Sequence, residues 1–380
     1  MTSTAATLDA IIARVGDIAT PFAIELPNGE KRNLGQGEPE FCVSLRNERA
    51  LWALRSLDEG NISEAYLNGD LDIEGDMLKP FKLRRYFDDR HPLVRAWRFI
   101  EPILFGQVYT NKRAIASHYN ADPKLFLSFL DPVFPAYSQG VYANDDEPLA
   151  KALERKFDWA IEKCELGPGK RVLEIGPGWG AFASHALQTG VHFTGITNSE
   201  VSQSYLRSKL SNFGDRFDIL LTDFYDYERK EPFDAIVIMG VIEHLPDYER
   251  VLKKFSALLK PGGRVFLDGS AWKKKYELST FMVRHIYPGN HSFLVLDDFL
   301  NKLWKTDFEV DVIHNDRWSY FLTFRQWARN LDASRDFVTR TFGDFEFRKF
   351  RLYLWGATYV FLHRNLDCYR LILSKPKEAS

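Results

Sequence analysis

Gly176, Gly178 and Gly180 directly follow an apolar segment, residues 172–175, and one residue separates each glycine from the next. Glycines in such a loop let a ligand lie against bare backbone. Glu174 stands two positions before the first glycine, so a carboxylate is expected beside a positively charged ligand. The spacing differs from the Gly-x-Gly-x-x-Gly of dinucleotide folds, and no Gly-Lys-Ser/Thr follows it. The loop therefore argues against NAD and ATP.

Polar residues also follow the next predicted strands. Thr197 ends the second strand, where a ribose would lie. After the third strand, Asp223 can accept a hydrogen bond from an adenine amino group, and Phe224 can stack on the ring. Glu243 and His244 follow the strand after that. Because open α/β sheets bind ligands at the carboxyl ends of their strands, these residues together predict a site for S-adenosylmethionine.

The elements that must position these residues alternate along the chain. Apolar residues between Leu149 and Cys164 recur at three- and four-residue spacing, which predicts an amphipathic helix. Helices beginning at Ala181, Glu200 and Tyr248 then alternate with strands at 171–175, 193–197, 218–221, 235–239 and 264–267. Such alternation predicts a Rossmann-like α/β domain with a parallel sheet and helices on both faces. Beyond Lys273 the pattern is helical and aromatic, and it closes with a strand at 369–373.

The first part of the chain has a different pattern. Residues 1 to about 85 contain repeated turn signals such as Asn28-Gly29 and Glu59-Gly60, which predict a small α+β domain. A basic and aromatic stretch between about 90 and 117 is interpreted as a connector. We therefore expect two domains, 1–117 and 118–380.

The composition excludes several classes of protein. The 380 residues carry a formal net charge of −2, which gives no reason to expect nucleic-acid binding. Three widely separated cysteines predict reduced thiols and no zinc site. No secretory signal is recognised at the start of the sequence, and no apolar stretch is long enough to span a bilayer, so a cytoplasmic location is expected. The 14% aromatic content slightly favours an apolar substrate.

Nearly the whole chain resembles the cyclopropane-fatty-acyl-phospholipid synthase family, which includes the mycolic acid cyclopropane synthases. Two segments match more specifically than the glycine loop: Tyr137-Ser138 upstream of it and a Tyr-x-x-Thr-x-x-x-Trp segment beginning at Tyr320 downstream. The segment 60–70 resembles the lipid-engaging domain of the longer synthases. The other matching pieces are His118-Tyr119, Leu130-Asp131-Pro132, Tyr142, Thr197, Ser199 and Glu243-His244.

The resemblance implies a class I methyltransferase domain that transfers a methyl group from S-adenosylmethionine to the double bond of an unsaturated acyl chain, on a phospholipid. The product would be a cyclopropane, methyl-branched or methylene chain. Tyr137 and Ser138 would close over the cofactor, and a family Gln of the cofactor site corresponds to Ser202. The other residues expected to hold the cofactor are Glu174, Gly176, Gly178, Gly180, Thr197, Asp223 and Phe224.

In the family a bicarbonate ion acts as the base, held by a Cys, a Glu, a His and a Tyr. The Glu corresponds to Glu243 and the Tyr to Tyr320, but Gln139 replaces the Cys and Asp268 replaces the His. A carboxylate at Asp268 would either replace the ion or repel it, so bicarbonate binding is in doubt. His244 completes the set of candidate catalytic residues.

Two other functions stay open at this point. One is a small-molecule N-methyltransferase, in which Glu243-His244 would act as the base for an amine. The other is a non-catalytic lipid- or cofactor-binding protein, suggested by the two replaced bicarbonate ligands. The basic residues between Arg90 and Arg113 and the run Lys273–Lys275 predict attachment to an anionic membrane surface as a peripheral protein. The sequence leaves open whether the chain forms a homo-oligomer.

Overall fold

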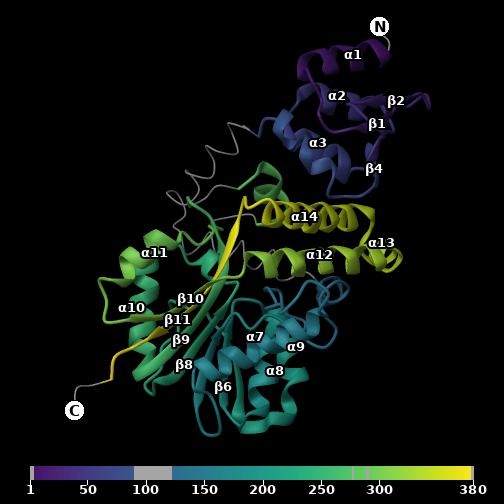
Figure 1. Ribbon diagram of the computed structural model, residues 1–380. Coiled ribbons are helices and arrows are strands. Elements are labelled where there is room, and N and C mark those ends of the chain that lie inside the picture. The colour runs from purple at the N-terminus through teal and green to yellow at the C-terminus, as the bar shows by residue number, and fades with distance from the viewer. Residues whose placement is uncertain (1–3, 90–121, 276–277, 288–290, 378–380) are drawn as a thin grey trace. The chain divides into compact units, whose positions relative to one another are not determined.

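The computed structural model describes residues 4–89, 122–275, 278–287 and 291–377 (Figure 1). These residues form two compact units. The described residues of the first unit lie within Met1–Ile100, Leu278–Ile286 and Leu331–Tyr359, and the second contains the rest. The first unit thus includes two later segments besides the N-terminal residues. The predicted boundary at 117 and the predicted connector lie outside the described residues, and the division at 117 stays a prediction.

The second unit is built on a seven-stranded sheet with the order β10-β11-β9-β8-β5-β6-β7. The five strands from β9 to β7 pair in parallel, as expected, whereas β11 pairs antiparallel with both β9 and β10. The predicted Rossmann-like α/β fold is confirmed, with an antiparallel end to the sheet that the alternation did not predict. The strands are β5 (Arg171–Ile175), β6 (His192–Thr197), β7 (Phe217–Leu221), β8 (Phe233–Met239), β9 (Leu259–Ala271), β10 (Glu309–Asn315) and β11 (Asp367–Ser374).

Helices cover both faces of this sheet. Figure 1 shows α10 and α11 on one side of it and α7, α8 and α9 on the other. A sheet covered on both faces needs strands that are apolar along most of their length, and Ala235, Ile236, Val237 and Ile238 of β8 are all fully buried. The helices of this unit are α6 (Pro123–Leu127), α7 (Leu149–Lys163), α8 (Ala181–Gln188), α9 (Glu200–Lys209), α10 (Tyr248–Leu258), α11 (Leu296–Leu303) and most of α12 (Arg317–Ala333), with short 3-10 segments at Ser211–Arg216 and Ile242–His244.

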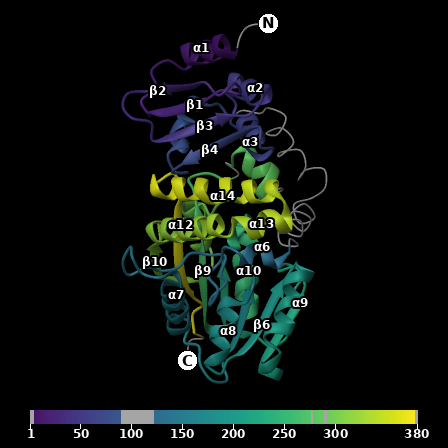
Figure 2. The same cartoon turned by 90° about the vertical axis from the view of Figure 1, so that its right-hand side faces the viewer.

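The first unit contains a four-stranded sheet with the order β2-β1-β3-β4 (Figure 2). Side-chain caps define where two of its helices begin, because Asn47 accepts from Arg49 and Ala50 N–H before α2, and Asp58 accepts from Asn61 N–H before α3. The predicted small α+β domain is therefore present. Its strands are β1 (Phe22–Glu25), β2 (Lys31–Leu34), β3 (Phe41–Leu45) and β4 (Leu71–Gly75). Its helices are α1 (Thr4–Val15), α2 (Glu48–Ser56), α3 (Glu59–Leu67), α13 (Arg335–Phe342) and most of α14 (Asp344–Leu362), with short helical turns at Pro80–Tyr86 and Met282–Ile286.

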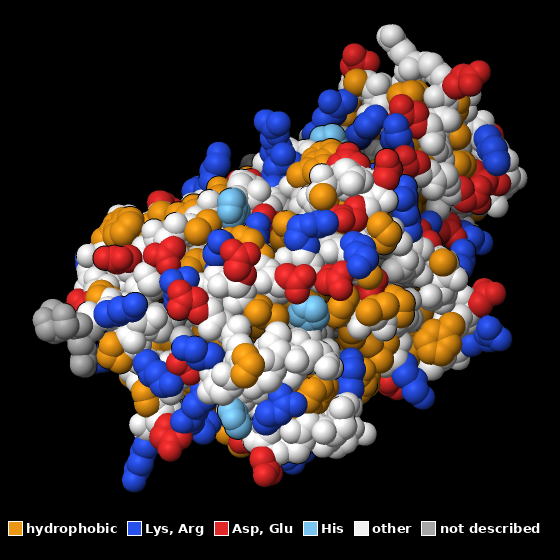
Figure 3. Space-filling view, turned by 60° about the horizontal axis from the view of Figure 1, so that its bottom comes forward, with side chains coloured by type: hydrophobic (Ala, Val, Ile, Leu, Met, Phe, Trp, Pro, Cys, Tyr) orange, Lys and Arg blue, Asp and Glu red, His pale blue; other side chains and the backbone are white. Residues whose placement is uncertain are grey.

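The surface carries both signs of charge. On the face drawn in Figure 3, Lys and Arg side chains are interspersed with Asp and Glu side chains, in keeping with the formal net charge of −2. Among the residues that the structure describes, no helix combines the length and the apolar character needed to cross a membrane.

Candidate active site

A cavity opens at the carboxyl ends of β5, β6 and β8 and beside the residues that follow β7. This is the sheet edge at which the sequence predicted the ligand site. Nine of the ten residues predicted to hold the cofactor line the cavity, and so does His244. The nine are Tyr137, Ser138, Glu174, Gly176, Gly178, Thr197, Ser202, Asp223 and Phe224.

Gly176 and Gly178 of the glycine loop line the cavity, whereas Gly180 does not. The local geometry at Gly178 and Gly180 explains this difference. Gly178 has φ 53°, and a Cβ built there would meet no atom within 4 Å, so a side chain would project into open space. Gly180 has φ 76° and precedes α8, and a Cβ there would lie 2.4 Å from Leu206 Cδ2. Gly178 therefore keeps the cavity open, whereas Gly180 permits a left-handed turn and close packing against α9.

The residues after β6 and β7 are held by local hydrogen bonds. Ser202 Oγ donates to the Gly178 carbonyl oxygen at 2.7 Å, which joins the start of α9 to the glycine loop. Asp223 Oδ1 accepts from Tyr225 N–H at 2.9 Å, and Asp223 Oδ2 accepts from Asn198 Nδ2 at 3.2 Å. Phe224 is buried with 4% exposure and packs on Phe255 of α10. The rim of the cavity is therefore ordered by the protein's own contacts.

Glu174 is the buried acid of the cavity. It is 3% exposed, and burial raises the pKa of its carboxyl to about 8. Its Oε2 atom has no hydrogen-bond partner among the described residues. A buried carboxyl oxygen without a partner is costly unless a ligand satisfies it. Together with the open space at Gly178, this atom fits a ligand with a positively charged group, as S-adenosylmethionine has.

Glu243 lies outside the lining of this cavity, in the 3-10 segment after β8. It is 4% exposed, and burial raises the pKa of its carboxyl to about 7. Its Oε1 accepts from Ser270 N–H at 2.7 Å, while its Oε2 has no partner among the described residues. Tyr320 of α12 is also buried, and burial raises the pKa of its hydroxyl well above the ordinary value, with a contribution from the nearby Glu243 carboxyl. The structure thus brings these two predicted catalytic residues into one buried group.

Asp268 of β9 is fully buried and does not line the cavity. Its Oδ2 accepts from Lys156 Nζ at 3.2 Å, and its Oδ1 accepts from Gly240 N–H at 2.9 Å. Lys156 also donates to Ser138 Oγ at 2.7 Å. Burial raises the pKa of the Asp268 carboxyl even though the adjacent Lys156 opposes that shift. Asp268 is therefore tied to a cation and to the loop after β8.

Sequence reasoning missed Lys156. It lies on α7 one position before Phe157, three after Leu153 and four after Ala152, all buried, so it stands on the apolar face of that helix. A lysine on the core-facing stripe of an amphipathic helix is rarely buried without a paired acid. That position in the stripe was the signal that could have identified it.

Gln139 and His244 complete the predicted set. Gln139 is 1% exposed, and its Nε2 lies 3.4 Å from Asp316 Oδ2, the oxygen that also accepts from Arg370 Nε at 2.8 Å. The side chain is thus part of a buried polar network. His244 lies edge-on to the His291 ring at 5.0 Å, and burial lowers the pKa of His244 to about 4. Its imidazole is therefore neutral near pH 7.

Aromatic rings extend from the cavity to Tyr320. The Tyr137 ring stacks on Trp327 with centroids 5.4 Å apart, and Trp327 contacts the Tyr320 ring at 6.2 Å. Phe324 and Phe361 lie 4.6 and 4.7 Å from Tyr320. The predicted aromatic segment of α12 therefore contacts Tyr137, which lines the cavity, through Trp327 and includes Tyr320 of the buried Glu243 group. This arrangement provides ring faces that can stabilise a developing positive charge.

Comparisons with known proteins identify the family of the chain. Residues 107–371 match the family model described as mycolic acid cyclopropane synthetase, and residues 10–83 match a domain of unknown function. The chain is 28% identical over 337 residues to the cyclopropane-fatty-acyl-phospholipid synthase of Escherichia coli K12, covering 85% of this chain and 86% of that protein. It is 25% identical over 337 residues to the sphingolipid C9-methyltransferase of Komagataella phaffii, covering 82% of this chain and 69% of that protein.

The fold is also similar to solved structures. The cyclopropane synthase MmaA2 from Mycobacterium tuberculosis superposes with a TM-score of 0.65 at 23% identity, over 70% of this chain and 98% of that one. The match to the family model covers well over half of the chain. The glycine loop, the strand-end cavity and these matches together show that this chain is an S-adenosylmethionine-dependent methyltransferase of the mycolic acid cyclopropane synthetase family.

Proposed function

We propose that this enzyme transfers a methyl group to a carbon of the double bond in an unsaturated acyl chain, carried by a phospholipid. The observation that supports this most is the buried Glu243 carboxyl, with a pKa of about 7 and one oxygen without a partner among the described residues, close to an aromatic cluster around Tyr320. Ring faces beside a group able to accept a proton are what methylation of an alkene requires. The names of the E. coli and Komagataella relatives both refer to lipids.

Within the cavity, each residue contributes a separate part of cofactor binding. The open space at Gly178 would receive the ligand against the backbone, and Phe224 would pack on the adenine while Asp223 accepts from its amino group. Glu174 would face the positive charge. Tyr137 and Ser138 would cover the ligand from the opposite side.

The proposed chemistry is balanced by loss of one proton. Bound S-adenosylmethionine supplies a methyl group on a positively charged sulfur. The π electrons of the alkene form the new bond to that methyl carbon while the electrons of the carbon–sulfur bond leave with sulfur. Loss of a proton from the transferred methyl group then closes a cyclopropane ring. A methylene group forms when a 1,2-hydride shift first moves the positive charge to the methyl-bearing carbon and the methyl group then loses the proton. A saturated methyl branch would need a hydride donor in addition, so we favour the first two products.

We assign the proton acceptor to Glu243 instead of Asp268. Both Asp268 oxygens already accept hydrogen bonds, from Lys156 and from the Gly240 backbone, whereas Glu243 Oε2 accepts none from the described residues. A carboxyl with a pKa near the working pH is suited to general base catalysis. Asp268 then has a positioning role.

Peripheral contact with a membrane would bring the enzyme to its lipid. Of the basic residues predicted to make this contact, those from Arg90 to Arg113 lie outside the described residues. Lys275 is engaged within the protein, because its Nζ lies 2.6 Å from Asp298 Oδ2 and donates to the Pro246 carbonyl oxygen at 2.9 Å. The proposed attachment therefore does not depend on Lys275.

Lipid mass spectrometry of cells that express the protein tests the proposed function. We expect unsaturated acyl chains to gain the mass of one CH₂ group, and cells that express Gly178→Val to show no gain. Nuclear magnetic resonance of the isolated lipid would separate a ring from a methylene group. An unchanged lipidome, with purified enzyme that methylates a soluble amine, would support the N-methyltransferase alternative instead.

A further inference from the structure

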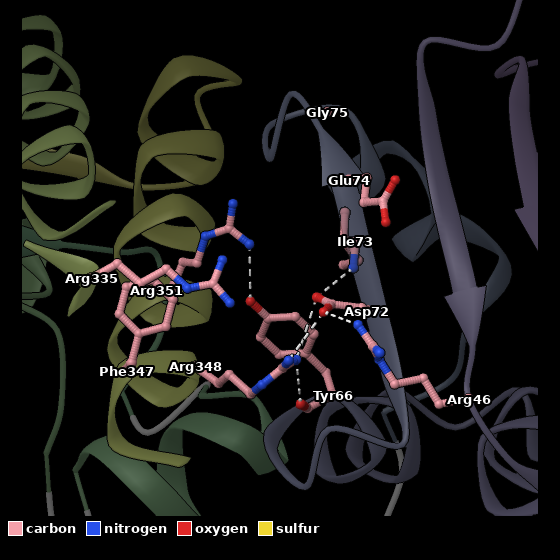
Figure 4. A pocket seen from close by; sticks show the side chains of 10 residues that line it. All are labelled: Arg46, Tyr66, Asp72, Ile73, Glu74, Gly75, Arg335, Phe347, Arg348 and Arg351. Atoms are coloured by element: carbon pink, nitrogen blue, oxygen red, sulfur yellow. Dashed lines mark hydrogen bonds and ion pairs between the residues drawn. The ribbon is translucent and has the colours of Figure 1, made fainter. Parts of the chain in front are cut away.

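The first unit contains a second pocket, of about 430 Å³, whose lining includes four arginines (Figure 4). Arg46 follows β3, and Arg335, Arg348 and Arg351 come from α13 and α14. Asp72 and Glu74 of β4 are the two acids in the lining. In the lining itself, formal positive charges therefore outnumber negative ones by two, while Asp344 and Asp332 outside the lining pair with Arg348 and Arg351. None of these residues lines the cofactor cavity.

The inner arginines are held in place by the protein. Arg348 is buried and donates to the Tyr66 carbonyl oxygen at 3.2 Å and to Asp72 Oδ2 at 3.1 Å. Arg351 donates from Nε to Asp332 Oδ1 at 2.7 Å, and its Nη1 lies 3.3 Å from the Tyr66 hydroxyl. Side chains fixed in this way lose little freedom when a ligand binds. All three Arg348 nitrogens donate within the protein, since its Nε also donates to Asp344 Oδ2. The donors left for a ligand therefore belong to Arg351 and to the outer arginines.

The outer arginines are accessible. The side chain of Arg46 is 56% exposed, although one of its nitrogens donates to Asp72 Oδ2 at 2.9 Å. Arg335 is exposed and lies over the Phe347 ring, with 5.3 Å from its Cζ to the centroid, and no ion pair to it is found among the described residues. Figure 4 shows Arg335 and Arg351 on one side of the pocket and Arg46 with Asp72 and Glu74 on the other. An anion can therefore enter between them.

We propose that this arginine-lined pocket of the first unit binds a phosphate group. A guanidinium presents planar N–H donors that match two phosphate oxygens at once, and several guanidiniums around one pocket recognise that group better than a single carboxylate. The phosphate belongs either to a lipid headgroup or to a free phosphate ion. Only the headgroup source rests on the proposed lipid substrate; the anion site itself does not.

The test uses the full chain and the double variant Arg46→Gln/Arg335→Gln, since both side chains are exposed and the buried Arg348 is left intact. Arg340→Gln is the matched control, because Arg340 is an exposed arginine of the same helix as Arg335 and does not line the pocket. One arm measures binding of inorganic phosphate by calorimetry. The other measures sedimentation with phosphatidylglycerol vesicles, compared with vesicles given the same negative charge by oleate.

For a headgroup site we expect the wild type and Arg340→Gln to prefer phosphatidylglycerol over oleate vesicles, and the double variant to lose at least about tenfold in that affinity, as expected when bidentate contacts are removed. For a free-phosphate site, the double variant would lose calorimetric phosphate binding instead. Equal binding by wild type and double variant in both arms would overturn the proposal and leave the arginines with a structural role only. If the double variant proves unfolded by circular dichroism, Arg335→Gln alone decides between the same outcomes.

These outcomes are distinguishable from failure of the proposed methyl transfer. Both arms measure binding and need no turnover. S-adenosylmethionine binding should be the same in the wild type and the double variant. An enzyme without lipid product but with phosphate binding that depends on Arg335 would refute the proposed function and support this site.

Discussion

Lys156 Nζ on α7 lies 3.2 Å from Asp268 Oδ2 on β9, and neither side chain is exposed to solvent. The same nitrogen donates to Ser138 Oγ, and the other Asp268 oxygen accepts from the Gly240 backbone. The Lys156–Asp268 ion pair and its two neighbouring hydrogen bonds thus join α7, the segment that contains Ser138, and the loop after β8. The charge introduced by Asp268 is therefore compensated inside the protein, which changes what that residue can do in the reaction.

Removing one member of this pair should be strongly destabilising. We expect Lys156→Met to lower the free energy of unfolding by about 3–5 kcal/mol, because it leaves a buried carboxyl without its cation. The double variant Lys156→Met/Asp268→Asn should recover a large part of that loss. Urea unfolding of the wild type, both single variants and the double variant measures the coupling. Strict additivity of the two single effects would show that the ion pair contributes nothing.

Valine at Gly178 should abolish cofactor binding without unfolding the protein, because its side chain would enter the cavity. Gly169→Val is the matched control: Gly169 has φ 77°, also has open space at its Cβ position, and does not line the cavity. Both variants carry the strain of a left-handed residue, about 1–2 kcal/mol. Calorimetry with S-adenosylhomocysteine should detect binding by the control only. Equal affinity in the two variants would refute the assignment of the glycine loop.

Activity should rise with pH as Glu243 ionises. Burial raises the pKa of Glu243 to about 7, so the fraction able to accept a proton increases through neutrality. Glu243→Gln should lower kcat by about 10²–10⁴-fold, the usual contribution of a general base. It should also abolish the rise of kcat with pH, which is the limb of the pH profile assigned to Glu243. Asp268→Asn should keep the limb. A pH profile of kcat for the three proteins checks this, and a limb that persists in Glu243→Gln would exclude Glu243 as the base.

The stability of the cofactor-free enzyme should depend on the ionisation of Glu174. Burial raises its pKa from 4.5 to about 8 in the folded protein. Between these two pH values the unfolded chain has released the proton that the folded chain still keeps. The free energy of unfolding is therefore largest below pH 4.5 and falls as the pH rises toward 8, by at most about 1.4 kcal/mol per pH unit. Glu174→Gln should flatten this dependence, whereas Glu309→Gln on the exposed edge of β10 should not. Urea unfolding across that pH range measures the free energy of unfolding as a function of pH. The same pH dependence in the wild type and in Glu174→Gln would contradict the interpretation.

Added bicarbonate should leave the activity unchanged. Gln139 is part of the network with Asp316, and Asp268 brings a carboxyl where the family resemblance would place a histidine. The ion therefore lacks two of the side chains that the family resemblance assigns to it, and the Lys156 cation nearby is already paired with Asp268. Turnover in buffer depleted of carbon dioxide should equal turnover after bicarbonate is restored. Stimulation by bicarbonate would show instead that Glu243 and Tyr320 still hold the ion.

Much of the cofactor cavity could be predicted from the sequence because its residues stand directly after strands. Gly176, Thr197 and Phe224 belong to different strand ends, and parallel strands bring those ends to one edge of a sheet whatever the order of the strands. The apolar strands themselves are recognisable from local pattern. The edge strand β10 has no continuous apolar run, so it was missed, although the alternation of its first residues, Glu309 to Val312, was a strand signal.

The sequence by itself therefore determined the α/β alternation, the glycine loop and the family to which they belong. Only the tertiary structure decided how buried charges pair. Lys156 and Asp268 are 112 residues apart, and Arg335 shares a pocket with Arg46 although about three quarters of the chain separates them. Local periodicity shows which face of a helix or strand is buried, but the partner of a buried charge depends on which elements pack together. That choice results from burying all the apolar faces at once and is not contained in any single segment.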